Sequence, residues 1–322
     1  MVEWLAPILE AAAVLLYAGA WLDVRRTDPG GARALVTAAV YGLTLEAANI
    51  ALFGTYHYPD VYVLRIATVP IYIALLWAVI LHSSLAITDR LGLARWARPF
   101  ADGLIALLLD LAVDAVAIRL GLWEWRSPLE GNRRLAFDEG WFGVPPGNLT
   151  AWMWVAASYG YFRRALDAAG DRRRWGIARE AAVVLLSYAG LFAGIFLSAV
   201  VRRPFGIETQ TGRLWILAGQ AAVFLVIASC GVPRSTSQVP REPGAGTRGT
   251  WNLERGTPLP TSYVVARWSI HLSFAILLLG TGIWRSTPSL LAVSAGTILL
   301  EALVGRAARR SLSTASAPIR PT

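Results

Sequence analysis

Two acidic residues stand inside a long apolar segment, and their spacing suggests acid chemistry. Asp110 and Asp114 lie in a predominantly apolar run from Leu104 to Leu122. Such a run, of about nineteen residues, is long enough to cross a bilayer as a helix. Residues four apart lie on one face of a helix, on neighbouring turns. Because a carboxyl group is costly at membrane depth, we expect this pair to belong to a functional site.

A third acid lies in another apolar segment: Glu46, with Asn49 three residues further on. At about 1.5 Å per helical residue, the three acids lie at comparable depths, so they would meet if the second and fourth helices pack together. Adjacent buried carboxyl groups oppose each other's ionisation, so one is expected to keep its proton and act as a general acid. The alternative is a structural role, in which each acid pairs with an arginine or caps a kinked helix.

Aromatic residues are concentrated near these acids. The chain has 14 tryptophans, and an interfacial belt is the ordinary explanation for a tryptophan near the end of an apolar run. The group between 123 and 152 is denser than anchoring requires. Aromatic faces can cradle a polyene, or stabilise a carbocation by about 0.5–2 kcal/mol per ring. The candidate substrate-binding residues are Asn49, Tyr56, Tyr58, Trp123, Trp125, Trp141, Asn148 and Trp152.

The composition predicts the fold class, an all-α polytopic integral membrane helical bundle. Hydrophobic residues make up 55% of the chain and charged residues 16%, and the mean hydropathy is +0.49. The apolar runs predict about nine transmembrane helices, with eight possible because the count around 200–215 is ambiguous. The expected spans are 4–22, 34–54, 62–82, 103–122, 149–167, 179–201, 213–231, 264–283 and 288–305.

The arginines predict how the chain is oriented. All 30 basic residues are arginines, and most fall on the cytoplasmic side if the N-terminus is outside and the C-terminus cytoplasmic, as the positive-inside rule requires. Arg202, Arg203 and Arg213 do not fit this arrangement. The expected location is the cell membrane, with a multi-pass topology. No nucleic-acid partner is expected, because the net charge of +9 is spread over the ends of apolar runs.

The chain is expected to have four parts. Residues 1–230 would form the membrane core with the site, 231–262 a flexible cytoplasmic linker rich in Pro, Gly and Ser, 263–308 two further transmembrane helices, and 309–322 a disordered tail. The N-terminal segment lacks a basic n-region, so it is expected to stay as a helix. A single cysteine, Cys230, excludes an intrachain disulfide framework. His57, His82 and His271 lack ligand spacing, so neither a metal nor a cofactor is expected.

Two blocks of sequence resemble the CruF-type carotenoid 1,2-hydratases, which are integral membrane proteins. The blocks span residues 42–152, about a third of the chain. Where the family usually has Asp-Pro this chain has Asp114-Ala115, and Asn148-Leu149 and Ala151-Trp152 replace the usual Asn-Phe and Gly-Trp. The resemblance therefore supports the reaction class better than the substrate. The matching residues are Asp110-x3-Asp114, Gly121-x-Trp123-x-Trp125 and Trp141-Phe142-Gly143-Val144-Pro145-x2-Asn148-x3-Trp152, with Glu46, Gly54-x-Tyr56-x-Tyr58-Pro59, Val69-Pro70 and Trp77.

The resemblance implies a cofactor-independent hydratase of carotenoid biosynthesis, which is a carbon–oxygen lyase. It would add water to the terminal double bond of an acyclic carotenoid end, like that of lycopene or γ-carotene, and leave a tertiary alcohol. Asp110 or Asp114 would supply the proton, and Glu46 with Asn49 or Asn148 would hold the water. The substrate would come from the bilayer through a lateral entrance between helices. Membrane lipid and other carotenoid-pathway enzymes are the expected partners.

Two other functions fit parts of the pattern. Asp110-x3-Asp114 matches half of the signature of the UbiA-type intramembrane prenyltransferases, but those enzymes need a second Asp-rich cluster, which this chain lacks. A non-catalytic carotenoid or lipid transporter, or a scaffold, is the second alternative. Transporters often contain internal repeats and broken helices at matched positions, and neither is evident here.

Overall fold

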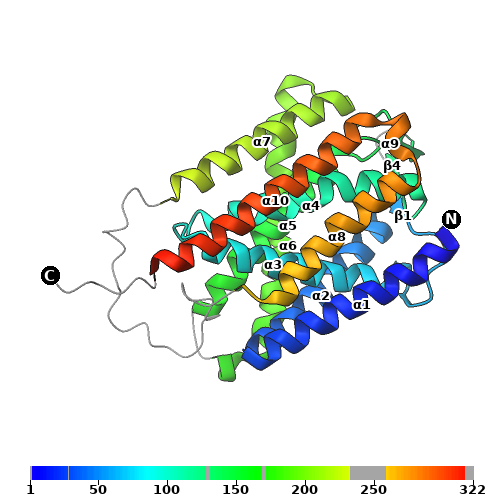
Figure 1. Ribbon diagram of the computed structural model, residues 1–322. Coiled ribbons are helices and arrows are strands. Elements are labelled where there is room, and N and C mark those ends of the chain that lie inside the picture. Colours follow the sequence, from blue (N-terminus) through cyan, green and yellow to red (C-terminus); the bar gives the residue numbers. More distant parts are fainter. Residues whose placement is uncertain (1, 28, 128–130, 169–171, 233–258, 316–322) are drawn as a thin grey trace.

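The computed structural model describes residues 2–27, 29–127, 131–168, 172–232 and 259–315, which form one bundle of long helices with small strands at one end (Figure 1). The long helices are α1 (Val2–Thr27), α2 (Pro29–Phe53), α3 (Ile71–Arg90), α4 (Arg98–Leu120), α5 (Pro146–Ala168), α6 (Arg172–Arg202), α7 (Gln210–Cys230), α8 (Thr261–Gly280) and α10 (Pro288–Ala315). The short elements are β1 (Tyr56–His57), β2 (Arg65–Ile66), β3 (Val69–Pro70), β4 (Glu124–Ser127), β5 (Arg133–Arg134), η2 (Arg203–Phe205) and α9 (Ile283–Ser286).

The structure confirms an all-α membrane bundle. Within the described ranges, seven helices are long and apolar enough to cross a membrane: α1, α2, α3, α6, α7, α8 and α10. The other two long helices, α4 and α5, have comparable lengths but carry more charge, and their charged residues face other helices. Asp102, Asp110 and Asp114 on α4 are all buried, as is Arg163 on α5. Each of the nine expected segments thus corresponds to a long helix.

The expected third span, 62–82, was placed too early, because α3 begins at Ile71 and ends at Arg90. The apolar residues before it form a loop with the β2–β3 pair. The Glu10 carboxylate of α1 accepts hydrogen bonds from the backbone N–H groups of Val63 (3.1 Å) and Leu64 (3.0 Å). Tyr62 and Val69 are buried, whereas Val63, Leu64 and Ile66 are exposed, and hydropathy alone does not distinguish this loop from the start of a transmembrane helix.

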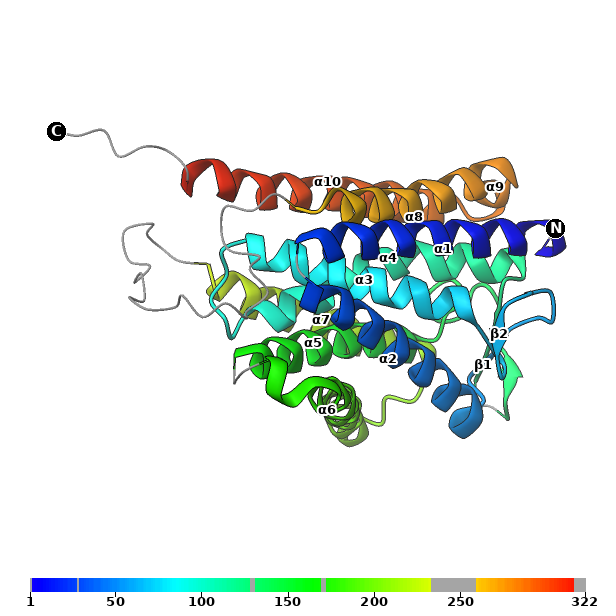
Figure 2. The ribbon, with the colours of Figure 1, turned by 90° about the horizontal axis from the view of Figure 1, so that it is seen from below.

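The helices form layers around α3 and α4. In Figure 2, α8 and α10 lie on one side, α3 and α4 lie in the middle, and α5 and α6 lie on the opposite side. The observed packing agrees, because α4 contacts α3, α5, α7, α8 and α10. In the most apolar segment of α3, 83% of the residues are buried within the protein, whereas only 11% are buried in the corresponding segment of α7. The polar groups of α3 and α4 are therefore shielded by other helices.

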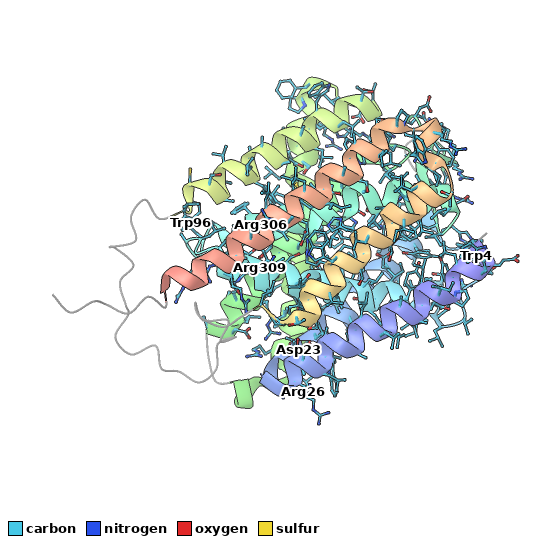
Figure 3. The ribbon with its side chains drawn as sticks, viewed as in Figure 1. Trp4, Asp23, Arg26, Trp96, Arg306 and Arg309 are labelled. Carbon is cyan, nitrogen blue, oxygen red and sulfur yellow. The ribbon has the colours of Figure 1, made fainter. Side chains whose placement is uncertain are left out.

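The two ends of the bundle differ in charge. Trp4 lies at one end, whereas Arg26, Arg306 and Arg309 lie at the other (Figure 3). The start of α1 and the end of α10 are thus at opposite ends, as an odd number of crossings requires. The three arginines that did not fit the sequence-based topology lie in the α6–α7 turn at the Trp4 end. There Arg202 and Arg213 both pair with Glu208, and the turn separates two distinct helices.

Only part of the expected linker and part of the expected tail lie among the residues that the structure describes. Most of the linker, 233–258, lies outside the described residues, as does 316–322 at the C-terminus. The expectation of a disordered tail from 309 was wrong for its first residues, because α10 continues to Ala315.

Buried ion pairs join the helices near the arginine-rich end. Arg163 of α5 pairs with Asp167, one turn along the same helix, and with Glu180 of α6. Glu180 also accepts a hydrogen bond from Thr37 of α2, at 2.8 Å. Arg164 links α5 to α3 and α4 through Asp89 (2.9 Å) and Asp102 (2.5 Å). Each buried charge at this end has a partner on a neighbouring helix, which fixes the relative positions of the helices.

A further buried pair fixes α8. Arg267 is 1% exposed, and its guanidinium donates to both carboxylate oxygens of Glu301 on α10, at 2.6 and 2.7 Å. It also donates to the hydroxyls of Ser83 and Ser84 on α3 and to the carbonyl of Ile105 on α4. One side chain thus joins α8 to three helices.

We expect Arg267→Met to destabilise the protein by about 3–5 kcal/mol, because it leaves the Glu301 carboxylate buried without its partner. The double variant Arg267→Met/Glu301→Met should recover much of this loss, since no unpaired charge remains. Thermal unfolding in detergent measures both. The exposed pair Arg65–Asp60 is the control, and Arg65→Met there should change stability by about 0–1 kcal/mol. Equal effects at the two sites would contradict the structural role of Arg267.

Candidate active site

A small sheet at the Trp4 end brings together aromatic residues from two connections. The chain leaves α4 at Gly121, whose φ of 76° is readily adopted only by glycine, and enters β4. Strand β4 pairs antiparallel with β1, so that Tyr56 lies opposite Trp125 and His57 opposite Glu124. Side chains alternate between the two faces of a strand. The inward face consequently carries four buried rings: Tyr56, Tyr58, Trp123 and Trp125.

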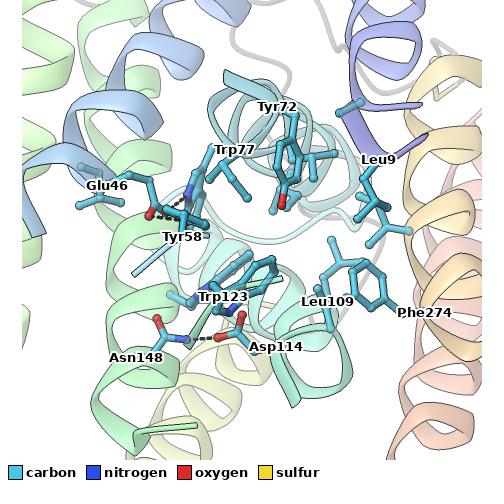
Figure 4. A pocket seen from close by; sticks show the side chains of 18 of the residues that line it. Leu9, Glu46, Tyr58, Tyr72, Trp77, Leu109, Asp114, Trp123, Asn148 and Phe274 are labelled. Atoms are coloured by element: carbon cyan, nitrogen blue, oxygen red, sulfur yellow. Dashed lines mark hydrogen bonds between the residues drawn. The ribbon is translucent and has the colours of Figure 1, made fainter. Parts of the chain in front are cut away.

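These rings form one wall of a cavity of about 440 Å³. The Tyr56 ring lies 4.7 Å from that of Trp125 and the Tyr58 ring 6.1 Å from that of Trp123, both edge to face. On the other side, Trp77 and Trp152 stack with centroids 4.3 Å apart. Most of the remaining lining is aliphatic, from α1, α3, α4 and α8. The cavity therefore suits a hydrocarbon, with polar groups confined to one region (Figure 4).

Glu46 of α2 is one of those polar groups, and three donors hold it. Trp77 Nε1 donates to its Oε1 at 2.6 Å, and the hydroxyls of Tyr58 (3.0 Å) and Tyr56 donate to its Oε2. The carboxylate is 7% exposed and lines the cavity. Its donors come from α3 and from the loop after α2, so the position of the carboxylate depends on both. This arrangement fixes a carboxyl group at the edge of an apolar space.

Asp110 and Asp114 form the second polar group, joined by Asn148. The Asn148 amide, in the first turn of α5, donates to Asp114 Oδ2 at 2.6 Å and to Asp110 Oδ2 at 3.1 Å. Asp114 lines the cavity next to Trp123 (Figure 4). Asp110 lies one turn away, is 0% exposed and does not line the cavity, and its Oδ1 has no hydrogen-bond partner among the described residues. The pair thus has an inner carboxyl group and a cavity-facing one.

The structure brings together most of the residues singled out in the sequence. Those that line the cavity are Glu46, Asn49, Tyr56, Tyr58, Asp114, Trp123, Trp125, Asn148 and Trp152. Asp110 contacts two of them from behind. Trp141 is the exception, because it does not line this cavity. Its indole donates to the Leu111 carbonyl at 2.7 Å, and it lines a separate outer hollow with Arg119 and Phe142.

The loop that carries Trp141 is fixed by polar contacts of its own. Arg119 of α4 donates to the carbonyls of Phe142 (2.7 Å) and Phe137 (3.1 Å). The hydrogen bond from the Arg133 side chain, and in second place that from the backbone N–H of Ala136, lower the pKa of Glu139 to about 2. The Arg133–Glu139 pair therefore remains ionised across physiological pH. The loop that carries Trp141 leads directly into α5, whose first turn contains Asn148.

The three carboxyl groups meet in a different way from the one expected. Helix α2 packs on α1, α3 and α6, and α4 packs on α3 and α5, so Glu46 and Asp114 both line the cavity although α2 and α4 share no extensive contact. Each group has its own set of donors. Within the described ranges, no three His, Cys, Asp or Glu side chains are placed to hold a metal ion.

Comparison with known proteins adds one finding to this geometry. The sequence profile described as "Carotenoid biosynthesis protein" matches residues 2–231. The chain belongs to this family. No curated protein and no solved structure matches the chain at a significant level. The family supports a role in carotenoid biosynthesis, and the cavity is lined by most of the polar residues on which the sequence resemblance rested.

Several cavity residues of this carotenoid biosynthesis protein were missed in the sequence. Tyr72 lies at the start of α3, which the expected third span obscured, and Trp77 of the same helix was noted only as part of the family resemblance. Tyr56-His57-Tyr58 and Trp123-Glu124-Trp125 alternate as strands do, and this signal could have predicted the β1–β4 pairing. The α1 and α8 residues are mostly aliphatic and have no distinguishing pattern. Helix α8 also lies beyond the matched residues.

We expect Gly42→Ala to disturb the site through Trp77. A Cβ at Gly42 would lie 2.4 Å from Trp77 Cβ, so the indole that donates to Glu46 must shift. Overpacking of this kind costs about 1–3 kcal/mol, measured as lower thermal stability in detergent. Gly19→Ala on α1 is the matched control, because nothing lies within 4 Å of its Cβ position. If the two variants unfold at the same temperature, α2 and α3 do not approach as closely as described.

Proposed function

We propose that this carotenoid biosynthesis protein is a hydratase that adds water to the terminal double bond of an acyclic carotenoid end. One observation carries the proposal: the Asp114 carboxyl group faces an apolar, aromatic-lined cavity while Asn148 joins it to the buried Asp110. An isolated trisubstituted alkene requires a strong acid and a place where a cation can survive. The cavity offers both next to space for a hydrocarbon.

The first step in this proposal is protonation of the alkene. Asp114 transfers its proton to the less substituted carbon of the double bond, and the π electrons form the new C–H bond. A tertiary carbocation remains on the other carbon. Asp110 shares Asn148 with Asp114 and has no competing donor at its Oδ1 among the described residues. Two carboxyl groups this close oppose each other's ionisation, which favours one proton on the pair.

The second step is stabilisation of the cation. Four aromatic rings from β1, β4 and the adjoining residues face the cavity, and each can contribute about 0.5–2 kcal/mol in a desolvated site. Glu46 supplies the fixed negative charge, held by Trp77, Tyr58 and Tyr56 before the reaction begins. Groups that are already oriented need no reorganisation as charge develops, and this is the main source of electrostatic catalysis.

The third step is capture by water. A water molecule adds its oxygen to the cationic carbon and loses a proton to the carboxylate left on Asp114, which restores the acid. The sum is one water added and no net change in the protein. Asn49 lines the cavity beside Glu46, and its Oδ1 accepts a hydrogen bond from the Thr55 hydroxyl at 2.8 Å. Because this contact holds the Asn49 side chain in place, Asn49 is suited to orient that water. No redox step is required by this chemistry.

The orientation follows from the charge asymmetry. With the arginine-rich end on the cytoplasmic side of the cell membrane, the N-terminus and the cavity lie toward the outer side. The substrate then comes from the bilayer, and other enzymes of the pathway are the natural partners. The prenyltransferase alternative gains no support, because the described carboxyl groups do not form a metal-binding set.

Expression in bacteria that make lycopene tests the reaction. We expect pigments heavier by one or two waters, with the added oxygen derived from isotope-labelled water and not from dioxygen. Asp114→Asn should lower product formation by about 10²–10⁴-fold, the contribution of a positioned general acid. Asp60→Asn is the matched control, because Asp60 is 84% exposed at the same end of the bundle. Unchanged pigment in the wild type, or full activity of Asp114→Asn, would overturn the proposal.

Glu46→Gln separates charge from shape. The amide nearly matches the carboxylate in size but lacks its charge, so we expect about 10²–10³-fold slower hydration, as when one electrostatic stabiliser is lost. Carotenoid binding, followed by the pigment retained on purified protein, should change little. Loss of binding together with activity would show that Glu46 maintains the cavity instead of stabilising the cation.

A further inference from the structure

The cavity extends from the carboxyl groups toward α1 and α8, and this extension is mostly apolar, with Ser269 and Ser273 of α8 as its polar side chains on that helix. Helix α1 contributes Leu9, Ala13 and Leu16, and α8 contributes Ile270 and Phe274. Figure 4 shows Leu9 and Phe274 on the side of the cavity opposite Glu46. The polar head of the site and this apolar arm are thus at opposite ends of one continuous space.

The exposure of the lining residues shows where the cavity opens. Nearly all of them are buried or half-buried, including those around the carboxyl groups. Ala12, Leu15 and Ser273 are exposed, with Leu15 at 72%. Two of these lie on α1 and the third on α8, so the mouth lies on the side of the bundle formed by these two helices.

The register of α1 against α8 places the mouth within the membrane. The helices run antiparallel side by side (Figures 1 and 2), and the Ser262 hydroxyl at the start of α8 donates to Asp23 of α1 at 2.8 Å. The number of residues from Ala12 to Asp23 on α1 equals the number from Ser262 to Ser273 on α8, so Ala12 and Ser273 lie at the same height along the two helices. At ~1.5 Å per residue this level is about 16 Å from the contact, which is well inside a bilayer core of about 30 Å.

One side of the mouth belongs to a part of the chain beyond the family match. The matched residues end at 231, and α8 begins at Thr261. Helix α8 is nevertheless fixed to the matched core, because Arg267 donates to Ser83, Ser84 and Ile105. The C-terminal helices therefore complete a cavity whose acids lie in the matched core.

We propose that the gap lined by Ala12, Leu15 and Ser273 is a lateral portal through which one end of a long acyclic isoprenoid chain enters from the bilayer. This inference rests on the proposed function. A cavity of about 440 Å³ is in the range that holds a drug-sized ligand, roughly 300–1,000 Å³, so a whole carotenoid does not fit inside. The end group lies near Asp114 while the rest of the polyene passes between α1 and α8 into lipid. Each end of a symmetric substrate must then enter separately.

Bulky side chains at the portal test this. Ala12→Trp and Ser273→Trp should each lower hydration of a long acyclic carotenoid by about tenfold or more, which corresponds to roughly 1.4 kcal/mol. A short acyclic isoprenoid alkene that fits wholly inside the cavity should be affected much less, because no chain has to remain in the portal. The matched controls are Val14→Trp on α1 and Leu272→Trp on α8, which are exposed next to the portal residues but do not line the cavity.

The outcomes separate the portal from the reaction. Equal losses for long and short substrates, or equal losses in the outward-facing controls, would overturn the portal while leaving the hydratase intact. If the wild type hydrates neither substrate, the proposed function fails, and retention of carotenoid on purified protein in nanodiscs then decides the portal. Retention lowered by Ala12→Trp and Ser273→Trp but not by the controls would support it, and equal retention in all four variants would overturn it.

Discussion

A polar group buried among membrane helices must find its hydrogen bonds within the protein, because the hydrocarbon around it supplies none. This constraint organises the whole bundle. At the arginine-rich end it is met by complete ion pairs, as in the contacts of Arg163, Arg164 and Arg267, and these fix the helices relative to one another. At the opposite end it is met incompletely. Asp110 and Asp114 contact an asparagine, whereas Asp102, Glu180 and Glu301 each pair with an arginine.

That difference separates the scaffold from the site. An acid paired with arginine is held ionised and is of little use as a proton donor. An acid next to another acid, in contact only with a neutral amide, can still carry a proton. Helix α4 contains both kinds: Asp102 pairs with Arg164, and two to three turns further on Asp110 and Asp114 share Asn148. The cavity opens at the second kind only, beside aromatic rings that tolerate positive charge.

The sequence predicted the helical bundle and most of the residues that line the cavity, but not how all of them are arranged. The bundle, the acids and most of the aromatic residues could be identified because charge in an apolar run and dense tryptophan are strong local signals. The start of α3 was misplaced because the apolar loop before it resembles a span. Trp141 lies outside the cavity, and residue type does not reveal which way a side chain faces. The span of α8 was predicted, but its place in the cavity wall was not, because an aliphatic cavity wall looks like any other apolar helix surface.

The β1–β4 pairing also bears on how the protein matures during synthesis. The two strands belong to different helical hairpins, α2–α3 and α4–α5, which emerge from the ribosome one after the other. The aromatic wall therefore cannot assemble when the first hairpin enters the membrane, and must wait until the second has been translated and inserted beside it. Until α8 follows, the acids remain accessible from the side. A nascent chain thus acquires a shielded cavity only after α8 has been translated and inserted.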